Sequence, residues 1–323
     1  MRGSPVIRAL AFVLLLLAAA AQAQTYPTRP VTIIVPFAPG GISDITARPL
    51  AAALGKIMGQ SFIIENRPGA GGAIGAAHAA KQRPDGYSLM MALTSLMVIP
   101  EAEKVAGRQP SYLISQFAPI ARVAADPAVL LVRSESPWKT TADLVADARN
   151  RSGRISYSSS GLYGAIHVPM EMLAQSAGMQ MIHVPYKSGG EAMTALLAGQ
   201  VDVTVQAPGV ASPHVKSGKV RVLGSWGAQR TKALPEVPTL KEQGHDVEFY
   251  IWSALFAPAE TPSDIVVKLR SAVKEAINEP LFTKAMAGMD APIEYLDAPD
   301  LQSNMDREGK RLADTVQRMG KIE

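Results

Sequence analysis

Apolar, strand-like runs alternate with helix-like segments almost throughout the chain. Val31–Phe37 is apolar and rich in β-branched residues, which is typical of a strand covered on both faces of a parallel sheet. A turn broken by proline and glycine follows, and a helix is predicted to open at Ser43, a good N-cap residue. Because this order of strand, turn and helix recurs, the pattern predicts an α/β fold with mainly parallel sheets.

The same pattern gives approximate limits for the remaining elements. The predicted strands are Val31–Phe37, Phe62–Glu65, Ser88–Leu93, Val129–Val132, Ile155–Ser158, Met181–Val184, Val201–Val205, Val220–Leu223 and Tyr250–Phe256. The predicted helices are Ile42–Met58, Ala73–Lys81, Thr141–Arg149, Ala165–Ala177, Glu191–Ala198, Pro262–Ile277 and Pro299–Met319. Pro49 falls inside the first helix and should kink it.

The N-terminal segment has the organisation of a cleavable export signal. Arg2 and Arg8 supply a positive n-region, and Ala9–Ala21 is an apolar stretch rich in Leu and Ala. Ala21–Ala23 is a small-x-small cleavage site, so residues 1–23 are predicted to be removed and Gln24 to start the mature chain. We therefore expect an exported protein.

Composition narrows the class of exported protein. The chain has no Cys, which excludes disulfides, zinc–thiolate sites, cysteine nucleophiles and lipid attachment through an N-terminal cysteine. Export without disulfides fits a bacterial periplasm. Loss of Arg2 and Arg8 with the signal lowers the formal net charge from +4 to +2, and no basic run is present, so nucleic acid is not an expected partner.

The chain is long enough for two domains, yet it has no low-complexity linker. If two domains exist, the chain must cross between them through structured segments, and Ile120–Pro127 and Glu248–Ile251 are the candidates. The prediction is a discontinuous first lobe, residues 24–124 and 248–323, with a second lobe, residues 125–247, inserted between the crossings.

Catalytic motifs are weak. The chain has no G-x-S-x-G elbow, Walker motif or correctly spaced dinucleotide fingerprint, and its five histidines lack metal-pair spacing. No metal or cofactor is therefore expected. Ser159 or Ser160 with His167 is the one sequence-local nucleophile and base, which keeps an exported hydrolase open as an alternative.

Polar or glycine-rich turns recur where strands meet helices. They are Pro39–Gly41, Thr94–Ser95, Ser158–Gly161, Lys187–Gly190 and Gln206–Gly209. Ligands of open α/β sheets bind at the carboxyl ends of strands, and helix N-termini with free amides favour anions. The recurrence favours binding of a small anion without chemistry.

Several of these segments resemble one known family. The matching stretches are YPTRPVTIIVPFAPGGISDITAR, ENRPGAGGAIGA, PDGYSLM, VPYKSGGEAMTALLAGQVDV, HVKSGKVRVLG and LPEVPTLKEQG, in this order. Together they resemble the Bug-type periplasmic solute receptors of tripartite tricarboxylate transporters. The resemblance implies a two-lobed, type II-like periplasmic binding fold, with a sheet in each lobe and a cleft that closes on a small carboxylate.

The resemblance also implies which residues contact the ligand. In the first lobe they are Phe37, Ala38, Gly40, Gly41 and Asp44 of the turn after the first strand, with Thr94 and Ser95. In the second lobe they are Ser159, Ser160, Gly161, Tyr163, His167 and Gln206.

Two departures from the family pattern bear on the ligand. The usual Asn-Gly-Ser of the second-lobe loop is Leu162-Tyr163-Gly164 here, and Gln206 stands where many members carry Asp. A neutral amide cannot form an ion pair with a ligand amine, so an α-amino acid is disfavoured. We expect a carboxylate with a less polar or aromatic body near Tyr163, the alternative being that Leu162 and Tyr163 pack within the lobe.

The resemblance finally implies partners. We expect a monomeric receptor whose closed form is recognised by a small and a large transmembrane permease subunit. A ligand sensor without a dedicated permease is the alternative within this class.

Overall fold

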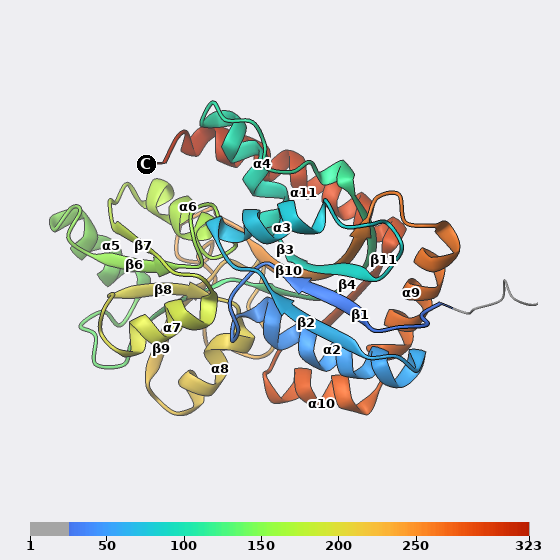
Figure 1. The fold of residues 1–323 in the computed structure, drawn as a ribbon. Coiled ribbons are helices and arrows are strands. Elements are labelled where there is room, and N and C mark those ends of the chain that lie inside the picture. The colour runs from blue at the N-terminus through green and yellow to red at the C-terminus, as the bar shows by residue number, and fades with distance from the viewer. Residues whose placement is uncertain (1–25, 323) are drawn as a thin grey trace, which may run out of the picture.

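The computed structural model describes residues 26–322, which form two lobes, each built on its own β-sheet (Figure 1). The two-lobed α/β fold expected from the sequence is confirmed. The predicted signal, residues 1–23, lies outside the described part of the chain. No helix among residues 26–322 has the length and apolar character needed to cross a membrane.

The first lobe contains a six-stranded sheet in the order β11-β4-β10-β3-β1-β2. Its strands are β1 (Val31–Val35), β2 (Phe62–Asn66), β3 (Ser88–Leu93), β4 (Phe117–Pro127), β10 (Tyr250–Pro258) and β11 (Ile293–Asp297). Its helices are α2 (Ile42–Met58), α3 (Ala73–Ala79), α4 (Ser95–Val105), α9 (Ser263–Ala276), α10 (Pro280–Gly288) and α11 (Ala298–Met319), with short 3₁₀ turns at Ala70–Gly72 and Ile114–Gln116. Helices α3, α4 and α11 cover one face of the sheet, and α2 and α9 pack on the other, with α10 lying against α2 (Figure 1).

The second lobe contains a five-stranded sheet in the order β7-β6-β8-β5-β9. Its strands are β5 (Val129–Arg133), β6 (Ser156–Ser159), β7 (Ile182–Pro185), β8 (Val203–Gln206) and β9 (Val220–Ser225). Its helices are α5 (Thr141–Asn150), α6 (Val168–Ala177), α7 (Gly189–Leu197) and α8 (Pro208–Lys216).

Both sheets are mixed, which corrects the expectation of mainly parallel sheets. In the first lobe β1 runs parallel to β2 and β3, whereas β10 is antiparallel to β3 and β4, and β11 is antiparallel to β4. In the second lobe β6 is parallel to β7 and β8, whereas β5 is antiparallel to β8 and β9. The reversals occur at the strands that carry the chain between lobes, because a strand that leaves a lobe and one that returns run in opposite directions.

The chain passes between the sheets at Ala128, which joins β4 to β5, and again where β10 begins. Ala128 directly follows the segment Ile120–Pro127 named as the first crossing, and β10 begins within Glu248–Ile251, named as the second. The Thr94 hydroxyl, at the end of β3, donates to the Tyr250 carbonyl at 2.8 Å and accepts from Trp252 N–H at 3.1 Å, which holds the second crossing against the first lobe. The lobe limits at residues 124, 125, 247 and 248 stay a prediction.

The sequence pattern missed the helices α4, α8 and α10 and the strands β4 and β11, although Ile120–Pro127 of β4 was named as a crossing. Helix α4 is buried from Ser95 to Pro100 and continues the apolar run of β3, so it shows no helical period. Helix α8 has proline at its start and at Pro213. Pro49 lies inside α2 as expected, and α2 continues as one helix past it.

Candidate functional site

The turn between β1 and α2 is held in shape by a buried carboxylate. Asp44 accepts hydrogen bonds from the Gly40 N–H at 3.1 Å, from Arg48 Nε at 2.9 Å and from Asn66 Nδ2 at 3.0 Å. Burial alone would raise the pKa of Asp44, but these hydrogen bonds and the Arg48 charge outweigh it and hold the pKa below its ordinary value. Asp44 therefore positions the turn, and its four hydrogen bonds, two of them from Arg48, stay within the first lobe.

Across from this turn lies the N-terminus of α7 in the second lobe. An added Cβ on Gly41 would lie 3.2 Å from Gly189 N, and one on Gly190 would lie 2.8 Å from the carbonyl of Gly40. The N-terminal ends of α2 and α7 thus face each other through four glycines without side chains. Each end carries partial positive charge, so together they form an anion-binding arrangement.

The first-turn amides of both helices are available at this meeting point. Gly41 caps α2 with no side-chain hydrogen bond, and within residues 26–322 the N–H groups of Ile42 and Ser43 find no acceptor. The N-cap of α7 is Ser188, whose hydroxyl accepts from Glu191 N at 3.2 Å. The N–H groups of the two glycines that follow it likewise find no acceptor in the described chain.

The two lobes are in direct contact around this point. The Ala38 N–H donates to the Lys187 carbonyl at 3.1 Å, and the Ser188 hydroxyl reaches the Pro39 carbonyl at 3.5 Å. A second contact joins the 3₁₀ turn before α3 to the loop after β6, where an added Cβ on Gly161 would lie 2.5 Å from Gly71 N. Backbone meets backbone at these places, so the lobes are closed on each other.

The loop after β6 does not form the nucleophile–base pair that the sequence suggested. Ser159 Oγ pairs instead with Nε2 of His183 at 2.6 Å and accepts from Gly161 N–H at 3.0 Å. The Nδ1 of His167 accepts from Tyr163 N–H at 3.1 Å, and its Nε2 has no hydrogen-bond partner in the described chain. Ser159 and His167 are both fully buried, so these groups shape the loop and are closed to a substrate.

Both histidines of this loop region are neutral. Burial, with a contribution from His183, lowers the pKa of His167 well below its ordinary value, and burial lowers the pKa of His183 to about 4. Their rings lie 4.2 Å apart, centroid to centroid. Neither is charged at neutral pH, so neither supplies a counter-ion for an anion.

The Tyr163 side chain is buried against the residues that follow α11. Its hydroxyl accepts from Ile322 N–H at 3.1 Å and lies 3.5 Å from the Gly320 carbonyl, both just after α11. Its ring meets His167 edge-on. These partners lie in the segment predicted for the first lobe, so Tyr163 does not pack within the second lobe alone, and its place beside the ligand stays a prediction.

The remaining predicted residues support the backbone around the meeting helices. Gln206 is buried, and its Nε2 donates to the Gly189 carbonyl at 2.9 Å, which steadies the start of α7. Thr94 holds the second crossing, as described above. Phe37, Ser95 and Ser160 are buried beside these turns.

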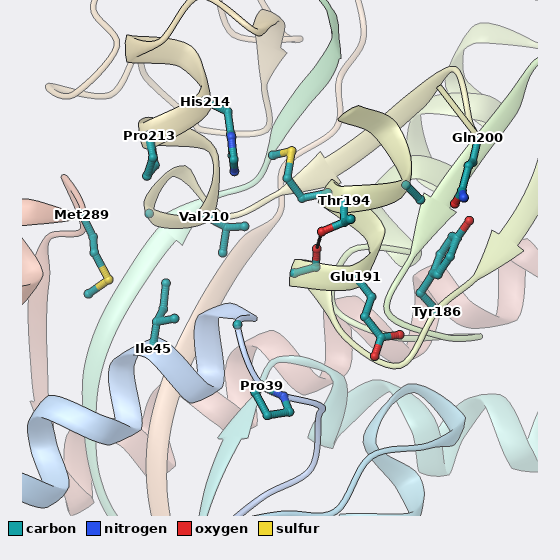
Figure 2. Close-up of a pocket in the computed structure, with 15 residues that line it drawn as sticks. Pro39, Ile45, Tyr186, Glu191, Thr194, Gln200, Val210, Pro213, His214 and Met289 are labelled. Carbon is teal, nitrogen blue, oxygen red and sulfur yellow. Dashed lines mark hydrogen bonds between the residues drawn. The ribbon is translucent and has the colours of Figure 1, made fainter. Parts of the chain in front are cut away.

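A cavity of about 730 Å³ opens beside the facing helix ends, and we call it the interlobe pocket (Figure 2). Its lining residues are Pro39, Gly40, Ile45, Tyr186, Gly190, Glu191, Met193, Thr194, Ala195, Gln200, Gly209, Val210, Pro213, His214 and Met289. Of the site residues predicted from the sequence, Gly40 alone is among the described residues that line this pocket. The lining residues from α7 and α8, and Met289, were not among the site residues predicted from the sequence. The pair Gly189-Gly190, which repeats Gly40-Gly41, was a signal that could have found the α7 residues.

This geometry can bind an anion but offers no metal centre. Among residues 26–322 no group of three His, Asp or Glu side chains could hold a metal ion. The arrangement supplies backbone donors and two helix dipoles from opposite lobes, which suits reversible capture of a small anion.

Comparison with known proteins gives the chain a family. The model of the tripartite tricarboxylate transporter family receptor matches residues 46–322. The UPF0065 protein in gbd 5'region of Cupriavidus necator is 36% identical over 280 residues, which cover 87% of this chain and 84% of that protein.

Solved structures agree. Periplasmic binding protein BugD superposes with a TM-score of 0.85 at 30% identity, covering 91% of this chain and 98% of that one. MatC from Rhodopseudomonas palustris, solved with bound malate, superposes with a TM-score of 0.83 at 29% identity, covering 90% of this chain and 100% of that one. The chain therefore belongs to the receptor family of the tripartite tricarboxylate transporters, and it is a periplasmic solute-binding receptor and not an enzyme.

Proposed function

We propose that this receptor captures a small carboxylate between the N-termini of α2 and α7. The observation that carries the proposal is the meeting of these two helix ends, one from each lobe, through Gly40, Gly41, Gly189 and Gly190. Two positive dipole ends repel each other when they approach, and an anion between them removes that repulsion. MatC, with its malate, is a relative whose ligand is a carboxylate of this kind.

Binding would act through hinge closure. A ligand shifts an equilibrium between open and closed forms only if it binds one form better. A carboxylate held by amides of both lobes meets that condition, because those amides come together only when the lobes are closed. The closed form would then be recognised by a small and a large transmembrane permease subunit, after export through the predicted signal at residues 1–23.

The site residues named from the sequence take two kinds of role in this proposal. Phe37, Ala38, Gly40 and Gly41 form the first-lobe wall at the ligand carboxylate. The others position backbone: Asp44 the first turn, Gln206 the start of α7, Thr94 and Ser95 the end of β3, and Ser159, Ser160, Gly161 and His167 the loop that closes on Gly71.

A single glycine substitution tests the proposal. Gly190→Ala places a methyl group 2.8 Å from the Gly40 carbonyl, which keeps the lobes apart. Ala is a better helix former than Gly by up to about 1 kcal/mol, so the second lobe should keep its stability. We expect at least a tenfold loss of carboxylate affinity, measured by calorimetry on a panel of mono- and dicarboxylates, with no fall in the melting temperature of the ligand-free protein.

Gly309→Ala is the matched control, because an added Cβ there in α11 meets nothing within 4 Å. It should bind the same carboxylates as the wild type. Equal affinity of the Gly190→Ala variant and the wild type would contradict closure at this point, and absence of binding across the whole panel would contradict carboxylate capture.

A further inference from the structure

The walls of the interlobe pocket are mainly apolar and come from both lobes. Ile45 from α2, Val210 from α8 and Met289 from the turn after α10 face the same space (Figure 2). Pro213 and Met193 extend this surface. A pocket of about 730 Å³ lies within the range of small-molecule sites, and its apolar lining favours an apolar body.

The charges around the pocket disfavour a second anion. No Lys or Arg is among the described residues that line it, and Glu191 contributes a carboxylate to its wall. The Lys187 N–H donates to that carboxylate at 3.0 Å, so Glu191 is fixed near the helix end. A second carboxylate placed among the apolar walls, away from the helix ends, would therefore find no counter-ion.

His214 does not change this balance. Burial lowers its pKa first, and the nearby charge of Lys219 lowers it further, so the ring is neutral at neutral pH. The Thr194 hydroxyl donates to the Gly190 carbonyl at 3.0 Å, so its proton is already hydrogen-bonded within α7. The neutral polar groups at the rim, Tyr186 and Gln200, can hydrogen-bond a hydroxyl or carbonyl but cannot neutralise a carboxylate.

From this pocket we infer the class of ligand, an inference that rests on the proposed function: the receptor takes a monocarboxylate with an apolar body. Its carboxylate lies between the N-termini of α2 and α7, and its body fills the interlobe pocket against Ile45, Val210 and Met289. Dicarboxylates bind less well, because their second charge falls among apolar walls, and no Lys or Arg is among the described residues that line the pocket.

Hexanoate and adipate test this directly, since they share a chain length and differ by one terminal carboxylate. Calorimetry on the mature protein should give hexanoate at least a tenfold lower dissociation constant than adipate. Further monocarboxylates, such as benzoate and phenylacetate, and malate as a short dicarboxylate complete the panel. The inference would be overturned, and carboxylate capture left intact, if adipate or malate bound at least as tightly as the tightest-binding monocarboxylate.

A charge variant gives the converse test. Thr194→Lys adds a cation at an exposed position on the wall of the pocket and on a helix that tolerates Lys well. It should improve adipate binding relative to hexanoate by about tenfold. Thr194→Gln adds length without charge and should weaken both ligands alike, so an unchanged ratio with Thr194→Lys would contradict the inference. Absence of binding by any carboxylate would overturn it together with the proposed function.

Discussion

Among single residues, Asp44 shows how one side chain can shape a binding turn without facing the ligand. Its carboxylate is buried, and it joins Gly40 to Arg48 and Asn66. Removal of one partner from a buried charged network leaves the others unsatisfied, which costs more than an exposed ion pair is worth. Asp44 was named as a site residue from the sequence, but its partner Asn66 comes from β2, a separate element.

Asp44→Asn should lower the free energy of unfolding by about 1–3 kcal/mol at pH 7. The folded pKa lies below the ordinary value of 3.8, so the carboxylate stabilises the fold above that pH and loses its contribution as the pH falls below it. The difference between wild type and variant should therefore shrink below about pH 3.8, in urea titrations at several pH values. A difference that is constant with pH would contradict an ionised Asp44.

At the level of elements, α11 connects the lobes. It packs on α4 and β4 in the first lobe, and its C-terminal end reaches α6 in the second (Figure 1). There the Tyr163 hydroxyl contacts Gly320 and Ile322. This contact joins the loop after β6 in the second lobe to the end of α11, so we expect it to favour the closed form.

Tyr163→Phe should weaken binding of the preferred carboxylate by a few-fold, up to about tenfold, since a hydrogen bond contributes about 0.5–1.5 kcal/mol. Tyr112→Phe is the matched control, because the Tyr112 hydroxyl donates to the Leu96 carbonyl at 3.0 Å within the first lobe. That variant should lose stability but keep its affinity. Equal losses of affinity in the two variants would show that Tyr163 has no particular role in closure.

For the molecule as a whole, the first crossing between the lobes contains a buried carboxyl group, Asp126. Asp126 lies near the end of β4 and is only 4% exposed. It borders a cavity of about 1170 Å³ that is also lined by residues of α11. Burial, and then the charge of Glu294, raises its pKa to about 8. The folded state therefore keeps a proton that the unfolded state has already released at neutral pH.

Because the folded state binds more protons than the unfolded state between about pH 3.8 and about pH 8, stability from Asp126 falls as the pH rises through that window. Asp126→Asn replaces the carboxyl group with an amide that does not titrate, so the variant does not lose stability in this way as the pH rises. Its melting temperature should exceed that of the wild type at pH 8 by more than at pH 5. Asp314→Asn, an exposed change in α11, should leave the pH profile of the melting temperature unaltered.

Much of the local structure could be predicted from the sequence. The predicted strands at Val31, Phe62 and Ser88 begin where β1, β2 and β3 begin, and Ile42–Met58 is α2 as predicted, because apolar runs act on their immediate neighbours. The predicted N-cap Ser43 was wrong, since Gly41 caps α2 and the Ser43 hydroxyl donates to the Met91 carbonyl instead. The resemblance to the family correctly gave the two-lobed fold. Strand direction was not predictable in this way, since a strand pattern is the same whichever way its neighbour runs.

The sequence by itself determined most of the elements, the glycine turns and the family of receptor, because each depends on local patterns or on motifs kept in order. Only the tertiary structure decided which turns meet. The facing of Gly41 and Gly189, the pairing of Ser159 with His183, and the contact of Tyr163 with the end of α11 each join residues that are far apart in the chain or whose side chains could point either way. Those contacts follow from how two sheets pack and close, which local propensity does not specify.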